Sequence, residues 1–186
     1  MSPQTQDIPY RMFLFNFYGA FFRGEINNSW RDSWNDASTI ATALTGNEHR
    51  TSLPDELSMK RAFATAFYGV GKETLPLAQS CWENDKRLNC GEACKRCREK
   101  YAELGLVSNS FNNLPEDHIG LVLAFASILL QENKAHELPA FLSDTLAAWW
   151  PYAESAMKKR SEWETLAPVL SSFSDFLKTE ISKQES

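Results

Sequence analysis

Four cysteines have the spacing in this chain that is most suggestive of chemistry. Cys81 is followed by Cys90, Cys94 and Cys97, and the last two form a Cys-x2-Cys pair. Thiolates at such spacing bind zinc or an iron–sulfur cluster, or they interconvert between thiol and disulfide. The last three also share one helical stripe with Tyr101, as buried residues of a helix do. We interpret the cysteines as core residues, and a metal site or a redox sensor is the alternative.

A second polar cluster precedes the most apolar stretch of the chain. Pro115, Glu116, Asp117 and His118 are followed by twelve residues without a charge. Proline and carboxylates are typical of a helix N-terminus. The pattern therefore predicts a buried helix over 116–132, with a neutral, hydrogen-bonded His118 in its first turn. Successive helical residues point about 100° apart, which argues against a catalytic pair of Asp117 and His118. The residues alone allow either a capped helix or a polar binding pocket here.

The sequence patterns of common enzymes are missing. The chain has three histidines and neither an HExxH nor a GxSxG motif. Residues 66–73 approach a phosphate-binding loop, but Ala66 and Glu73 stand where that loop needs a glycine and a hydroxyl. A glutamate at the second position repels phosphate. We therefore expect a glycine turn after a helix in this segment, and a protein that is not an enzyme.

Charge and hydropathy restrict the class of partner. The net charge of −5 argues against a nucleic-acid-binding surface, which would be basic. No stretch reaches the roughly 18 apolar residues of a transmembrane helix, so stable membrane insertion is not expected. Residues 13–22 are apolar, but a single arginine precedes them, which is typical of a buried helix and not of a signal peptide. We therefore expect a cytoplasmic protein whose cysteines are thiols or metal ligands and not structural disulfides.

Composition and periodicity indicate helices throughout. Leucine and alanine greatly outnumber valine and isoleucine, a balance that favours an all-α fold. Apolar positions from Trp30 through Trp34 to Leu44 follow one face of a predicted helix, and Gly46 is a plausible C-terminal stop.

Capping residues predict the start of two further helices. Asn89 is positioned to cap the helix that carries the cysteines. Ser161 with Glu164 matches a capping box before a final helix, whose apolar face lies within 163–177.

The length of 186 residues fits one domain over 1–186. We find no internal repeat and no long linker, and we expect frayed ends at 1–6 and 182–186. The stretch 116–132 is apolar nearly all round, which is typical of a helix that others surround. The sequence predicts a single compact multi-helix bundle with this helix buried at its centre.

The order of elements between residues 76 and 177 is distinctive. The segment PLAQSCW at 76–82 precedes a helix that ends YAELGL at 101–106. The Pro-x-Asp-His signature at 115–118 then opens the apolar helix, and an aromatic segment over 141–152 and an amphipathic helix follow. This arrangement resembles the TorD/DmsD family of molybdoenzyme maturation chaperones over roughly the whole chain, and it implies a TorD-like helical fold.

The resemblance also implies a function. Members of this family are cytoplasmic, non-catalytic proteins that bind the twin-arginine signal peptide of a DMSO-reductase-type catalytic subunit. They delay export through the twin-arginine (Tat) pathway until the molybdenum cofactor is inserted, and they contact the enzyme body. Asp117 is the carboxylate that we expect to pair with a peptide arginine. The residues that the resemblance places in or near the peptide pocket are Pro115, Glu116, Asp117, His118, Trp82 and Tyr101.

Some features lie outside the family pattern. Many members have a Glu-Leu pair shortly after the histidine, where this chain reads Gly120-Leu121. The cysteines have no role in the family pattern, so a zinc or iron–sulfur protein or a redox sensor remains the alternative function. No cofactor is expected. Contact with a guanine nucleotide or with the molybdopterin cofactor, the identity of the client, and a monomeric or dimeric state all stay open.

Overall fold

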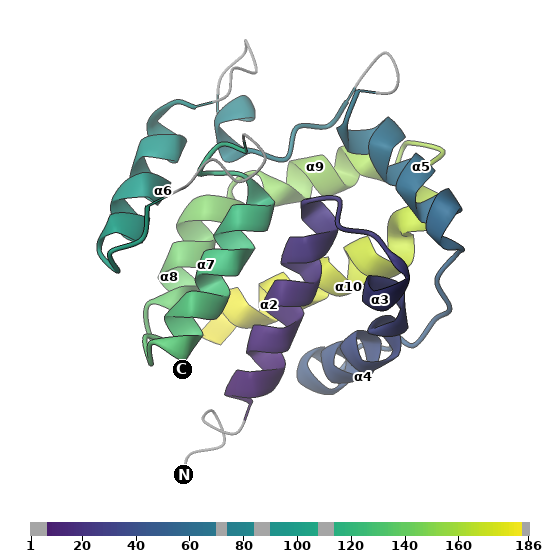
Figure 1. Ribbon diagram of the computed structural model, residues 1–186, viewed down its shortest axis with the longest axis horizontal. Coiled ribbons are helices and arrows are strands. Elements are labelled where there is room, and N and C mark those ends of the chain that lie inside the picture. Colours follow the sequence, from purple (N-terminus) through teal and green to yellow (C-terminus); the bar gives the residue numbers. More distant parts are fainter. Residues whose placement is uncertain (1–6, 70–73, 84–89, 108–113, 184–186) are drawn as a thin grey trace.

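The computed structural model describes residues 7–69, 74–83, 90–107 and 114–183 (Figure 1). Within these ranges the regular secondary structure is helical, and one isolated β-bridge joins Ala78 to His118. The predicted all-α class is therefore confirmed. Asn89 and most of the predicted glycine turn after residue 67 lie outside the described residues. So do the ends 1–6 and 184–186, whereas Ser182 is the last residue of a helix.

The described helices are named here in chain order. They are α2 (Ile8–Phe22), α3 (Asn28–Asp32), α4 (Trp34–Thr45), α5 (Glu56–Phe67), the 3-10 turn η1 (Gln79–Cys81), α6 (Glu92–Ala102), α7 (Ile119–Gln131), α8 (Leu138–Leu142), the π-helix η3 (Ser143–Ala147), α9 (Trp150–Met157) and α10 (Trp163–Ser182).

Helices α2 and α7 form the centre of the bundle. They lie side by side in Figure 1, and they contact each other more extensively than any other pair of elements. Most of α7 is buried, as its uncharged sequence predicts. Helix α2 contributes a group of large aromatic side chains to the same core. Burial of so much apolar surface is the main source of stability for a bundle of this size.

Two glycines allow α2 and α7 to approach closely. A Cβ atom added at Gly120 would lie 3.2 Å from the carbonyl oxygen of Gly19, and one added at Gly19 would lie 3.4 Å from the carbonyl oxygen of Gly120. The same Gly120 Cβ would also lie 2.6 Å from Cγ of Arg23. The backbones therefore meet where side chains would hold them apart, and Arg23 fills the space beside the contact.

The outer helices enclose this pair. Helix α10 crosses behind α2 and packs against α4, α5 and α8 (Figure 1). Its buried residues include Leu166, Leu170, Phe173 and Leu177, which confirms the predicted core face of the last helix. The predicted capping box at Ser161 is wrong. Helix α10 begins after Glu162, whose side chain makes no capping hydrogen bond.

Two other predicted boundaries need correction. The face from Trp30 to Leu44 belongs to two helices, because Ser33 ends α3 and starts α4. Gly46 ends α4 in a left-handed conformation, as predicted. The central helix starts at Ile119 and not at residue 116, so the polar residues before it form a turn instead of a first helical turn.

A buried ion pair joins the two ends of the described chain. The guanidinium of Arg11 donates from Nε and Nη2 to the carboxylate of Glu180, at distances of 2.6–3.0 Å. Both side chains are almost fully buried. A buried charge must be paired to be tolerated, so this contact fixes α10 against the first turn of α2.

Replacement of Gly120 by alanine tests the close approach of α2 and α7. Alanine normally stabilises a helix by about 0.5–1 kcal/mol relative to glycine. Here we expect a loss of about 1–3 kcal/mol in the free energy of unfolding, because the new methyl group overpacks the contact. Urea denaturation measures the change. The double variant with Arg23→Ala should recover part of the loss. A gain in stability for Gly120→Ala alone would contradict the close approach of the two backbones at this point.

Candidate functional site

The turn before α7 lies against the segment that leads into η1. The N–H of Ile119 donates to the carbonyl of Leu77 at 2.8 Å, and the β-bridge pairs Ala78 with His118. The N–H of His118 donates to the carbonyl of Pro115 at 2.9 Å, which closes the turn. These bonds hold the Pro-x-Asp-His signature beside η1, with α6 as a further neighbour.

Asp117 is fully buried. Its Oδ2 accepts a hydrogen bond of 2.6 Å from the N–H of Ser80. Its Oδ1 has no hydrogen-bond partner within the described part of the chain. A buried polar atom without a partner costs about 1–3 kcal/mol, and such atoms are rare in folded proteins. Asp117 therefore belongs to the interior of the site and does not reach the surface in this conformation.

His118 caps the start of α7. Its Nδ1 accepts a hydrogen bond of 3.1 Å from the N–H of Gly120, and the ring is 5% exposed. Burial, and to a smaller extent the nearby positive charge of Arg23, together lower the pKa of His118 from 6.5 to about 4. The predicted neutral, hydrogen-bonded histidine is confirmed. His118 is an N-cap with extended backbone. Asp117 and His118 are therefore not successive residues of a helix, and the expected angle of about 100° between them does not apply.

Helix α6 covers the signature through Tyr101 and Cys97. The hydroxyl of Tyr101 donates to the carbonyl of Glu116 at 2.7 Å, and its ring packs on Phe125 with centroids 4.7 Å apart. Burial, together with the negative charge of Asp117, raises the pKa of Cys97 to about 12. The Cys97 thiol is therefore protonated and unreactive at neutral pH.

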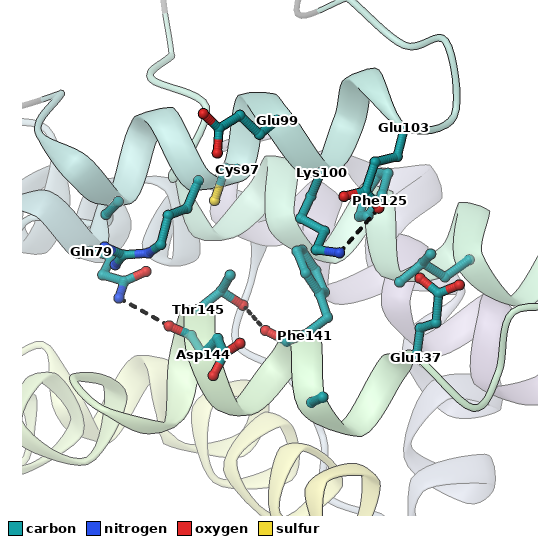
Figure 2. Close-up of a pocket in the computed structure, with 14 residues that line it drawn as sticks. Gln79, Cys97, Glu99, Lys100, Glu103, Phe125, Glu137, Phe141, Asp144 and Thr145 are labelled. Carbon is teal, nitrogen blue, oxygen red and sulfur yellow. Dashed lines mark hydrogen bonds and ion pairs between the residues drawn. The ribbon is translucent and has the colours of Figure 1, made fainter.

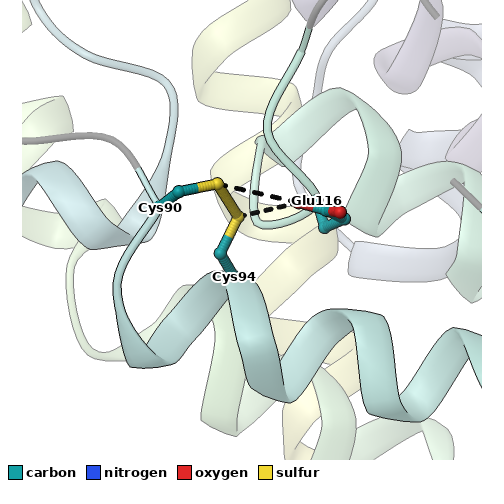
Figure 3. A group of neighbouring side chains, drawn as sticks. All are labelled: Cys90, Cys94 and Glu116. Carbon is teal, nitrogen blue, oxygen red and sulfur yellow. Dashed lines mark hydrogen bonds between the residues drawn. A yellow bond between two sulfur atoms is a disulfide. The ribbon is translucent and has the colours of Figure 1, made fainter. Parts of the chain in front are cut away.

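The side chain of Glu116 points towards the start of α6 (Figure 3). Its Oε1 accepts from Arg98 at 2.9 Å. Its Oε2 lies 2.9 Å from the sulfur of Cys94 and 3.7 Å from that of Cys90 (Figure 3). The hydrogen bond from Arg98 is the main cause of the lowered pKa of Glu116.

The cysteines do not behave as the sequence predicted. Cys90 and Cys94 are joined by a disulfide, with Cα atoms 4.9 Å apart, where thiols or metal ligands were expected. Cys90 is exposed and precedes α6, so it is not a core residue of that helix. Cys81, Cys94 and Cys97 are buried as expected. Cys81 and Cys97 lie outside the group of neighbouring sulfur and carboxylate ligands that Figure 3 shows.

An acidic cleft of about 590 Å³ lies between α6 and the α8–η3 region, with α7 behind it (Figure 2). In the ion pairs at its edge, Lys100 binds Glu103 and Lys134 binds Glu137. Its lining residues include Gln79, Arg96, Cys97, Glu99, Lys100, Glu103, Phe125, Glu137, Phe141, Asp144 and Thr145.

An apolar cleft of about 510 Å³ lies between α2, α7 and the end of α6. Val107 at its edge is 83% exposed. Phe125 lines both clefts. The lining residues of the apolar cleft are Asn16, Arg23, Glu25, Tyr101, Leu106, Val107, Leu121, Ala124, Phe125 and Ile128.

The structure brings several of the predicted site residues together. Residues 115–118 and Tyr101 form one cluster, and Tyr101 also lines the apolar cleft. The ring of Trp82 stacks on Trp149, and its indole N–H donates to the carbonyl of Pro76. Sequence reasoning missed Phe125, since an aromatic residue within an apolar run carries no signal beyond core packing.

A family model described as the nitrate reductase delta subunit matches residues 27–153, which is more than half of the chain. The chain belongs to this family. The family includes TorD-like chaperones, so the resemblance seen in the sequence is confirmed. The matched region contains the whole cluster around Asp117, whereas α2 and α10 lie outside it.

Similar curated proteins carry a more specific description. The Tat proofreading chaperone DmsD of Salmonella typhi is 27% identical over 129 residues, which are 68% of this chain and 60% of that protein. DmsD of Salmonella typhimurium (strain LT2) is 27% identical over 127 residues, 67% of this chain and 59% of that protein. The match thus spans less than two thirds of either relative. No solved structure matches the chain.

Two further findings concern enzymatic activity and membrane-spanning helices. The relatives are named as chaperones, which supports the prediction that the chain is not an enzyme. In the described ranges, no helix combines the length and the apolar character needed to cross a bilayer.

The buried neutral His118 makes stability depend on pH. Its pKa is lower in the folded than in the unfolded state, so the unfolded chain binds the additional proton as pH falls. Stability is therefore complete above the unfolded value of 6.5 and is lost as pH falls towards 4. Between pH 7 and pH 5 we expect a loss of about 2 kcal/mol from this residue.

Urea denaturation at the two pH values measures this loss. His118→Asn is the matched variant, because asparagine keeps an N-cap acceptor but does not titrate. It should show a pH dependence that is smaller by about 2 kcal/mol. His49, whose pKa burial also lowers, is present in both proteins and cancels in the comparison. An equal pH dependence in both proteins would show that His118 is not the source of this loss of stability.

Proposed function

We propose that this protein is a Tat proofreading chaperone for a molybdoenzyme catalytic subunit. It binds the twin-arginine signal peptide of that subunit in the cytoplasm and delays export until the cofactor is inserted. The observation that carries the proposal is the match of the region around Asp117 to the family and to DmsD. The two clefts beside that region support it, because they offer the two kinds of surface that such a peptide needs.

The chemistry of the clefts fits a twin-arginine leader. Such a peptide presents two guanidinium groups and an apolar stretch. Guanidinium groups bind carboxylates with charge-assisted hydrogen bonds, and apolar side chains gain by burial in an apolar groove. In this proposal the arginines lie in the acidic cleft and the apolar stretch lies in the apolar cleft. Phe125 is where the two parts of the peptide meet.

In this proposal the arginines do not bind Asp117, which was the carboxylate that the sequence suggested. Asp117 is fully buried and already accepts a hydrogen bond from Ser80. Glu99 and Asp144 are exposed and line the acidic cleft from opposite sides. We assign the arginine contacts to these two residues. Asp117 and His118 then hold the floor of the site, with Pro115 closing the turn, and Tyr101 forms part of the apolar wall.

The same charges weigh against an anionic cofactor in the acidic cleft. Four carboxylates line it against two basic side chains, those of Arg96 and Lys100. Phosphate groups of a guanine nucleotide or of the molybdopterin cofactor would meet a net negative surface there. The proposal therefore includes no bound cofactor.

Co-purification from the native host tests the function itself. A tagged form of the full chain should retain a molybdoenzyme precursor whose twin-arginine leader is still attached, as identified by mass spectrometry. The tagged Leu121→Asp variant places a charge in the apolar cleft, so it should lose the precursor. Recovery of mature enzyme without its leader, or of no molybdoenzyme, would refute the proposal.

Peptide titrations test the assignment of the acidic cleft. In calorimetry with a synthetic twin-arginine leader, the double variant Glu99→Gln and Asp144→Asn should bind about tenfold more weakly, because each lost charge pair costs of order 1 kcal/mol at an exposed site. Glu164→Gln, an exposed change on α10, is the matched control. The effect should shrink at high salt and for a leader with both arginines changed to lysine.

The same titration separates the two clefts. Val107→Ser removes an exposed apolar contact without touching the core, and its loss of affinity should not depend on salt. Equal binding by wild type and by all of these variants would contradict the placement of the peptide. The sequence instead predicted that Asp117 pairs with a peptide arginine. If that is so, Asp117→Ala should weaken peptide binding without any change in the thermal stability of the free protein.

A further inference from the structure

The start of α6 and the turn before α7 bring three metal-ligand atoms together. The sulfurs of Cys90 and Cys94 and a carboxylate oxygen of Glu116 all lie within 4.8 Å of one another (Figure 3). Two of the ligands come from residues 90–94 and the third from a segment more than twenty residues later. This set differs from the four-cysteine site that the sequence suggested, because it includes Glu116 and leaves out Cys81 and Cys97.

The carboxylate is oriented as a metal ligand would be. Arg98 engages Oε1 of Glu116 with both Nε and Nη2 at 2.9 Å, which leaves Oε2 turned towards the sulfurs. The backbone supports the same arrangement. The hydroxyl of Tyr101 binds the carbonyl of Glu116, and the N–H of Cys90 donates to Oγ of Ser80 at 3.1 Å. Hydrogen bonds behind a ligand are the usual means of fixing its direction.

The contact between sulfur and carboxylate favours the binding of a cation once the disulfide is reduced. Oε2 of Glu116 lies 2.9 Å from one sulfur and 3.7 Å from the other. A disulfide sulfur carries no hydrogen, so the carboxylate faces sulfur lone pairs. Two thiolates and a carboxylate bring three negative charges together, and the charge of Arg98 balances only one of them. A divalent cation bound to all three would compensate the rest.

We propose that the reduced protein binds Zn²⁺ through Cys90, Cys94 and Glu116, with water as the fourth ligand. Zinc takes sulfur at about 2.3 Å and oxygen at about 2.1 Å in a tetrahedral site, which separates those ligand atoms by about 3.6 Å. The Cys90–Glu116 distance of 3.7 Å matches this value, and the Cys94–Glu116 distance of 2.9 Å must lengthen when the metal binds. An iron–sulfur cluster fits less well, because such clusters use cysteine ligands throughout in most proteins. Cys90 is exposed, so water has access.

Loading of the site takes two steps, which are reduction of the disulfide and then binding of the metal. A dithiol reductant transfers two electrons and two protons to the Cys90–Cys94 disulfide, which yields two thiols while the reductant becomes a disulfide. Binding of Zn²⁺ then displaces the two thiol protons to solvent, and the Glu116 carboxylate adds without a proton. The inference does not rest on the proposed chaperone function.

Metal titration of the full-length, anaerobically reduced protein tests the site. One equivalent of Zn²⁺ should bind in competition with a chromophoric chelator. Co²⁺ in its place should show the d–d absorption of a four-coordinate site and a charge-transfer band for two thiolates. Cys90→Ser and Cys94→Ser should lose the charge-transfer band of a two-thiolate site. Glu116→Gln should weaken Zn²⁺ binding by at least about tenfold.

Matched variants keep the test decisive. Cys97→Ala and Lys95→Arg, which change the same helix outside the ligand set, should bind Zn²⁺ as the wild type does. Circular dichroism checks the fold of each variant, and the exposed Cys90→Ser decides the outcome if the buried Cys94→Ser does not fold. Unchanged binding by Cys90→Ser overturns the proposal. So does a reduced protein that titrates as four thiols and binds no metal, since the pair is then only a disulfide.

Discussion

The contact between α2 and α7 at Gly19 and Gly120 is the constraint on which the site depends. Because neither residue has a side chain, the two apolar helices meet backbone to backbone. The approach places Arg23 across the start of α7, where it donates to the carbonyl of Gly120 at 3.1 Å. It also buries His118, whose ring must then stay neutral. A larger residue at 120 would separate the helices and expose that ring, so the glycine fixes both the core and the site.

Burial of the signature has a consequence for its charges. Asp117 gains one hydrogen bond from Ser80 and no compensation for its second oxygen within the described residues. The surrounding groups respond, and the raised pKa of Cys97 shows that the thiol beside this carboxylate holds its proton. In the proposed function, the exposed carboxylates that border the cleft, and not the buried Asp117, recognise the cationic peptide.

The sequence predicted more of the fold than of the site. Composition and the apolar run at 119–130 were sufficient for an all-helical bundle with α7 at its centre. Helix starts were less predictable, because capping depends on geometry that the residue types leave open. Ser161 with Glu164 has the pattern of a capping box but lies one residue before the observed N-cap. His118 was expected inside the helix and instead caps it. The pairing of Glu116 with Arg98 and the cysteines joins distant segments, which periodicity cannot reveal.

Helix α6 connects the two proposed activities of this surface. It forms one wall of the acidic cleft, and its C-terminal end borders the apolar cleft. Glu116 holds it at two points: its carboxylate faces the sulfurs at the start of α6, and its carbonyl binds Tyr101 near the end. On the other side, Ser80 links the N–H of Cys90 to the carboxylate of Asp117. The proposed metal site and both clefts therefore share one helix, and Glu116 contacts that helix near each of its ends.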